Sequence, residues 1–265
     1  MKKLLYFVPV LILVLFMTVS NKLLSSGSIN PLTMILISVA IFGALMIFKP
    51  KSAAPKPMSD IEQKVRGDYA KDAFADKPQL AAKFQSALKD YSGSMPKAAI
   101  SKLEKLAPQC ATDQETYAVA MARALCYTGT QKYREAAKEY TRVLSLHPTA
   151  DVAFEAGSCF QRLGQLKKAM DSYQFAIDLD PENLRYRSSL ATAYVADGDY
   201  ETGLNHALAV LEMKPDHDSA LATAAICYGL LDEPLLRKRY TDLAVDSGYK
   251  KSKIDDTIAA LKKRN

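Results

Sequence analysis

The stretch AGSCFQRLGQLKKAMDSYQFAIDLDP, residues 156–181, decides the fold of this chain. Its small, aromatic and apolar residues are spaced for two short antiparallel helices, and Pro181 ends the second because proline cannot continue a helix. The pattern returns at a step of about 34 residues, with prolines at Pro148, Pro181 and Pro215 and aromatic residues at Tyr127, Phe160, Tyr194 and Tyr228. Such a unit cannot bury its apolar faces alone, so neighbouring units must stack into a solenoid.

The pattern resembles the tetratricopeptide repeat (TPR). In the second unit Gly157 stands where that family needs a small residue for close helix crossing, and Gly164 stands at the turn. Gln131 replaces the turn glycine in the first unit, and a fourth unit has Asp232 there and no closing proline. The resemblance implies an all-α, right-handed solenoid of helical hairpins over residues 115–248, with three clear repeats and one degenerate repeat.

Two uncharged apolar runs precede the repeats, at residues 4–19 and 32–48. Each is near the lower limit of about 17–25 residues that span a bilayer, and a polar break with Gly27 and Pro31 separates them. We therefore expect residues 1–48 to form a transmembrane helical hairpin that anchors the chain and contacts lipid. Cleavage of the first run as a signal peptide is the alternative, although no Ala-x-Ala site follows it.

Lysines set the expected orientation of this hairpin. Lys2 and Lys3 precede the first run, Lys49, Lys51 and Lys56 follow the second, and no acidic residue occurs before residue 57. Because positive residues favour the cytoplasmic side, both ends and the repeat domain are predicted to be cytoplasmic.

The remaining segments are expected to link and cap the array. Residues 49–58 form a linker rich in Pro, Lys and Ala, and residues 59–110 a divergent helical capping region. Apolar residues at helical spacing favour a last helix over residues 251–263, which would cover the exposed core of the final repeat.

Charge and motifs argue against several functions. Six of the 35 Lys and Arg residues lie before residue 57, which leaves 29 against 29 Asp and Glu residues, interspersed rather than clustered. This balance argues against nucleic-acid binding. Because phosphate-loop, dinucleotide and nucleophile motifs are missing from the sequence, no enzyme activity, catalytic residue or cofactor is predicted.

The cysteines and histidines are also given structural roles. Cys126, Cys159 and Cys227 share one repeat position with Ala193, which favours small buried side chains over a metal site. The cluster around His217 is read as a loop in which Asp216 or Asp218 caps the next helix.

The resemblance implies that the first helix of each unit lines a concave groove. The predicted partner-binding residues are Met121, Leu125, Thr128, Phe154, Ser158, Gln161, Arg185, Ser188, Thr192 and Val195. Chaperone-binding members hold a terminal carboxylate with a lysine, asparagine and arginine clamp, and only Arg185 matches it here. One arginine cannot give that multidentate contact. The lining therefore favours an amphipathic helix or an extended segment of a partner. The other interpretation is that the apolar members pack against neighbouring helices or the chain's own last helix.

The sequence thus predicts a membrane-anchored adaptor or scaffold that binds a protein or peptide segment. One alternative is an assembly factor on the exported side, similar to the two-span repeat proteins of cytochrome c maturation. Another is a structural platform in which the hairpins associate into a homo-oligomer through close approach at Ala40 and Ala44.

Overall fold

The computed structural model describes Val65 and residues 73–264. The predicted hairpin over residues 1–48, the linker and the start of the capping region lie outside the described residues. In the part that is described, no helix is both long and apolar enough to cross a bilayer.

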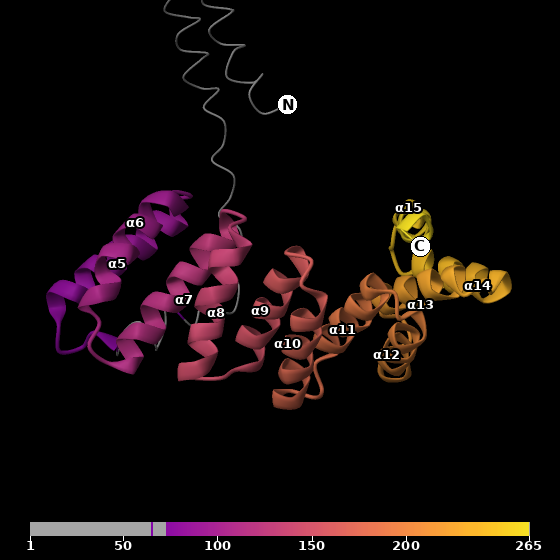
Figure 1. Ribbon diagram of the computed structural model, residues 1–265, viewed down its shortest axis with the longest axis horizontal. Helices are drawn as coiled ribbons and strands as arrows, with labels where there is room; N and C mark the ends of the chain where they lie inside the picture. The colour runs from indigo at the N-terminus through magenta and orange to yellow at the C-terminus, as the bar shows by residue number, and fades with distance from the viewer. Residues whose placement is uncertain (1–64, 66–72, 265) are drawn as a thin grey trace, which may run out of the picture. The chain divides into compact units, whose positions relative to one another are not determined.

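Residues 73–264 are helical or in turns, with no strand among them. The first helices are α5 (Pro78–Ser92), α6 (Pro96–Leu106), the 3₁₀ turn η1 (Ala107–Gln109), α7 (Asp113–Gly129), α8 (Tyr133–Leu146) and α9 (Ala150–Arg162). They are followed by α10 (Leu166–Leu179), α11 (Leu184–Asp197), α12 (Tyr200–Met213), α13 (Asp218–Leu230), α14 (Pro234–Asp246) and α15 (Lys251–Arg264). From α5 to α14 each α-helix packs on the next along the chain (Figure 1), which confirms the predicted all-α solenoid.

Each repeat hairpin between α7 and α14 turns through one residue with a left-handed backbone. Gly164 and Gly198 have φ values of 71° and 101°, and Gln131 and Asp232 adopt the same region at 61° and 58°. The following amide donates to a carbonyl five residues earlier, as in the 2.9 Å bond from Gln165 N to Phe160 O. The turn is therefore kept where glycine is replaced, at a conformational cost of about 1–2 kcal/mol per residue.

Close helix crossing explains the glycine of the second repeat. A Cβ atom on Gly157 would lie 2.7 Å from the ring of Tyr173 in α10 and 3.2 Å from the carbonyl oxygen of Ala169. Tyr173 is buried and the carbonyl belongs to a helix backbone, so neither can easily move away. The predicted role of Gly157 in helix packing is confirmed.

Side chains cap α7 and α13 in ways that the sequence analysis did not identify. Thr112 and Glu115 form a capping box at the start of α7, and Glu115 also binds Lys77 Nζ at 2.5 Å. The Lys77 hydrogen bond lowers the pKa of the buried Glu115 carboxyl. At α13 the predicted aspartate cap is wrong, because His217 Nδ1 accepts from the amide of Ala220 at 3.3 Å.

The predicted burial of the repeat cysteines is confirmed. Cys126, Cys159 and Cys227 are each no more than 1% exposed, and none of them forms a disulfide. Burial raises the pKa of Cys159 to about 11 and that of Cys227 to about 12. Both thiols are therefore protonated at neutral pH and are weak nucleophiles.

Candidate partner-binding face

The left-handed turn residue of each hairpin locates the same face on every first helix. Three positions recur before it, and we call their residues the first-helix face. They are Met121, Leu125 and Thr128 in α7; Phe154, Ser158 and Gln161 in α9; Ser188, Thr192 and Val195 in α11; and Ala222, Ile226 and Gly229 in α13.

Four of the ten predicted partner-binding residues lie in the core. The exposed fraction is 2% for Met121, 5% for Phe154, 4% for Ser188 and 5% for Val195. These side chains fill space between helices, so a partner cannot contact them while the helices stay packed. The burial of Met121 and Phe154 fits the alternative interpretation that apolar members pack against neighbouring helices.

Phe154 anchors an aromatic cluster between the second and third repeats. Its ring centroid lies 5.5 Å from that of Tyr173 and 5.3 Å from that of Tyr186 in α11. The Arg185 guanidinium carbon lies 4.0 Å from the Phe154 centroid, and Arg185 Nη2 lies 3.6 Å from Glu155 Oε1. The Arg185 side chain is nevertheless 62% exposed, so it covers the ring while its guanidinium remains open to solvent.

The aromatic cluster places Glu155, a carboxyl group with a raised pKa, beside this arginine. Burial raises the pKa of Glu155 above its usual value, Arg185 opposes that rise, and Asp151 adds to it. Asp151 accepts a 2.7 Å hydrogen bond from the Tyr186 hydroxyl. Because Glu155 already engages Arg185, the arginine is less available to a partner carboxylate.

The half-buried members of the face on α7 and α9 are mostly polar. Tyr173 Oη, from the second helix of its repeat, donates to Gln161 Oε1 at 2.7 Å and lies 3.5 Å from Ser158 Oγ. In the preceding repeat Thr128 Oγ1 lies 3.4 Å from Tyr140 Oη, which is in α8. Two buried tyrosines thus position hydroxyl and amide groups on the first-helix face.

The face on α11 is bonded mainly within the protein. Thr192 Oγ1 donates to the carbonyl of Ser189 at 2.8 Å, and Ser188 Oγ donates to Ser219 Oγ at 3.3 Å. Ser219 lies in α13, so the second bond joins consecutive first helices. Thr192 is half-buried and is the member of this helix that a partner can reach beside Arg185.

The C-terminal helix α15 covers the face on α13. It packs chiefly on α13 rather than on α14 (Figure 1), and its Ile254 and Ile258 are buried there. A Cβ atom on Gly229 would lie 2.6 Å from Ile258 Cδ1. At the other end of α15, Arg264 Nη2 donates to the carbonyl of Ala196 in α11 at 2.5 Å. The chain's own last helix therefore occupies this face in the fourth repeat.

The tyrosine supports were not predicted from the sequence, although a signal for them is present in it. Tyr140 and Tyr173 hold the same place in the first two repeats, where the later repeats have Ala207 and Thr241. A hydroxyl-bearing residue that recurs at a buried position needs a hydrogen-bond partner, which here lies on the first-helix face. Within residues 73–264 no group of three or more His, Cys, Asp or Glu residues could hold a metal ion.

A family model and curated proteins match this chain. The model described as "Psidin, N-terminal TPR repeats region" matches residues 93–241. A similar curated protein is the transcription factor tau 131 kDa subunit of Saccharomyces cerevisiae, 32% identical over 111 residues. That match covers 40% of this chain, and the chain spans only 11% of the yeast protein's length.

Solved structures share the fold at low sequence identity. A tetratricopeptide repeat protein from Parabacteroides merdae superposes with a TM-score of 0.61 at 16% identity, covering 69% of this chain and 72% of that one. YrrB, described as a TPR protein with an unusual peptide-binding site, has a TM-score of 0.56 at 18% identity. It covers 72% of this chain and 93% of its own.

Proposed function

Because the chain belongs to the family of the Psidin N-terminal TPR repeats region, we propose that it is an adaptor that holds a protein partner on its first-helix face. The face on α7, α9 and α11 receives the partner, since α15 already covers α13. No catalytic role is assigned, in keeping with a repeat fold that serves interaction.

The observation that carries this proposal is the polar row on α7 and α9. Thr128, Ser158 and Gln161 are half-buried, and tyrosine hydroxyls hold the row in place from within the repeats. An extended peptide presents unpaired backbone N–H and C=O groups that need such partners. Since Met121 and Phe154 are buried, little apolar surface is left for the apolar side of an amphipathic helix. An extended segment is therefore the favoured ligand.

The proposal also includes the membrane anchor. The apolar runs at residues 4–19 and 32–48 would hold the repeats near a bilayer, and the flanking lysines favour the cytoplasmic side. The linker over residues 49–58 would then separate the anchor from the capping region over residues 59–110, the array over residues 115–248 and the last helix. The support for this part is the sequence alone.

Position-specific photocrosslinking tests the binding face. A photoreactive amino acid at Ser158 or Thr192 is expected to capture one defined partner in native membranes. The same photoreactive amino acid in place of Lys138 or Gln174, which are exposed on the second helices α8 and α10, should not capture this partner. Equal capture from both sets of positions would refute the first-helix face as the binding site.

Protease accessibility tests the topology separately. Protease added to intact cells should leave the repeat domain uncut, and permeabilised cells should lose it. Digestion in intact cells would refute the cytoplasmic orientation and support the exported alternative, without bearing on which face binds the partner.

A further inference from the structure

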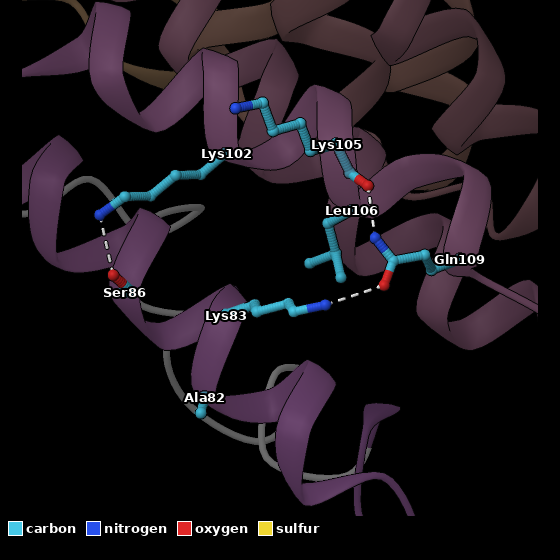
Figure 2. A pocket seen from close by; sticks show the side chains of 7 residues that line it. All are labelled: Ala82, Lys83, Ser86, Lys102, Lys105, Leu106 and Gln109. Atoms are coloured by element: carbon cyan, nitrogen blue, oxygen red, sulfur yellow. Dashed lines mark hydrogen bonds between the residues drawn. The ribbon is translucent and has the colours of Figure 1, made fainter.

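A basic cleft lies between α5 and α6, outside the first-helix face. Its volume is about 590 Å³, and Figure 2 shows the described side chains around it. They are Ala82, Lys83 and Ser86 from α5, Lys102, Lys105 and Leu106 from α6, and Gln109 from η1. Three lysines thus surround a hollow with one buried leucine on its wall.

The hairpin concentrates positive charge that the whole domain does not have. Residues 78–109 contain five lysines but only Asp90 and Glu104 as acids, whereas the chain beyond residue 56 is balanced at 29 against 29. Glu104 accepts a hydrogen bond from Tyr127 in α7 and does not line the cleft. The cleft therefore carries a local positive excess that attracts acidic groups.

The lysines are held apart rather than around one point. Lys102 Nζ binds Ser86 Oγ at 2.8 Å and Asp90 Oδ2 at 2.7 Å, whereas Lys83 Nζ points toward Gln109 Oε1 at 3.0 Å (Figure 2). No described residue pairs with the Lys105 ammonium group. Lys102 is thus already engaged by Asp90, whereas Lys83 and Lys105 lie on separate helices. A ligand with several spaced negative charges fits this arrangement.

We propose that this cleft binds an acidic peptide segment of a protein partner, with carboxylates near Lys83 and Lys105 and an apolar side chain beside Ala82. Exposed Ala82 and the aliphatic stems of the lysines line the cleft and suit one apolar side chain of such a segment. Because the site is a hollow rather than a flat surface, a protein segment that can enter it is a better occupant than a membrane surface. The cleft is a second contact site that does not depend on the first-helix face.

Peptide binding to the purified full-length chain tests the site. The probe is a fluorescein-labelled peptide in which glutamates flank a central leucine, followed by fluorescence anisotropy. The variant Lys83→Glu/Lys105→Glu should bind about tenfold more weakly, the loss expected for two exposed ion pairs. Added salt should weaken binding to the native chain, because exposed charges are screened. A peptide with glutamine in place of glutamate should not bind.

A matched control separates the cleft from overall charge. Lys138→Glu/Lys167→Glu makes the same charge change at exposed positions of α8 and α10 and should keep the native affinity. Circular dichroism should show unchanged helicity in both variants, and Lys83→Gln/Lys105→Gln should give an intermediate loss. Equal weakening by the control pair, or native affinity in the cleft variant, would overturn the proposal.

Two further arms distinguish other anions. Displacement of the peptide by equimolar inorganic phosphate would identify a site for a single phosphate group instead. In the second arm, the contrary outcome is that the cleft variant and the native chain bind the peptide equally. They would then differ only in binding to vesicles that contain phosphatidylserine in addition to phosphatidylcholine. That result would identify a membrane contact and overturn the peptide assignment.

Discussion

The first-helix faces of α9 and α13 hold the same place in their repeats but have different neighbours. On α9, Ser158 and Gln161 are half-buried and polar, and Tyr173 supports them. On α13 the corresponding Ile226 and Gly229 are buried, and α15 lies over them. The same face of the first helix is therefore open in the second repeat and covered by the chain's own helix α15 in the fourth. The side chains at these positions differ, since they are polar on α9 and are isoleucine and glycine on α13.

At Gly229 the absence of a side chain leaves room for α15. Ile258 of α15 packs where a Cβ atom would come within 2.6 Å of its terminal carbon. Gln161 occupies the corresponding position of α9, where it is half-buried and bound by Tyr173. A chain segment can dock as a helix on the fourth repeat, whereas the second repeat offers hydrogen-bonding groups to an extended one.

The largest expected effect comes from removing the apolar contacts of α15. In the variant Ile254→Ala/Ile258→Ala, each truncation of a buried isoleucine removes about 2–5 kcal/mol of packing free energy. We expect α15 to detach while α9 stays folded. Amide hydrogen exchange should show lost protection in α15 and native protection in α9. Lys253→Ala, an exposed change on the same helix, is the control, and equal loss of protection in α9 would contradict the independence of the two faces.

A pair of glycine substitutions should have the next largest effect. Gly157→Ala forces a Cβ atom against the Tyr173 ring and the backbone of Ala169, so we expect a loss of about 1–3 kcal/mol in chemical denaturation. Gly229→Ala meets the tip of Ile258, which can move with α15. It should cost less and mainly speed exchange in α15. A larger global loss for Gly229→Ala than for Gly157→Ala would show that α15 is a fixed part of the fold.

Removing a tyrosine hydroxyl tests the polar row. Tyr173→Phe deletes the 2.7 Å bond to Gln161 and should lower the free energy of unfolding by about 0.5–1.5 kcal/mol. Tyr140→Phe deletes only a 3.4 Å contact with Thr128 and should cost less. Thermal melts of both variants check this order. An equal, negligible change in both would mean that the tyrosines do not support the face.

The smallest effect is expected at Glu155 and depends on pH. Its pKa is raised in the fold, so the folded chain binds its proton more tightly than the unfolded chain. This contribution to stability is fully present below the pKa that Glu155 has in the unfolded chain. It is lost as pH rises through the pKa that Glu155 has in the folded chain. Glu155→Gln should therefore be relatively more stable at neutral pH than at pH 4, by less than about 1 kcal/mol, since exposed Arg185 loses only a weak partner.

Glu115 supplies the contrast for this pH test. Its pKa is lowered by Lys77, so its stabilisation is present above the unfolded pKa and is lost as pH falls through the folded pKa. Glu115→Gln should destabilise the protein at neutral pH and have little effect in strong acid. Melting curves of both variants across pH should shift in opposite directions, and shifts in the same direction would refute the assigned causes.

The candidate site was predictable in position but not in accessibility. The resemblance to the TPR family placed all ten proposed residues on first helices, and all ten lie in α7, α9 or α11. Burial of Phe154 depends on Tyr173 and Tyr186, which come from two other helices. The basic cleft was not predicted for a similar reason. Lys83 and Lys102 lie on separate helices, and the balanced overall charge gives no sign that they line the same cleft.

The sequence by itself determined the helices, the turns at Gly164 and Gly198, the small residues at helix crossings and the buried cysteines. Each of these follows from local spacing or from the volume available at one repeated position. Only the tertiary structure decided that Phe154 is buried, that His217 caps α13, that tyrosines hold the polar row and that α15 lies on Gly229. Those outcomes depend on side chains from different helices sharing one volume, which spacing along a single chain does not specify.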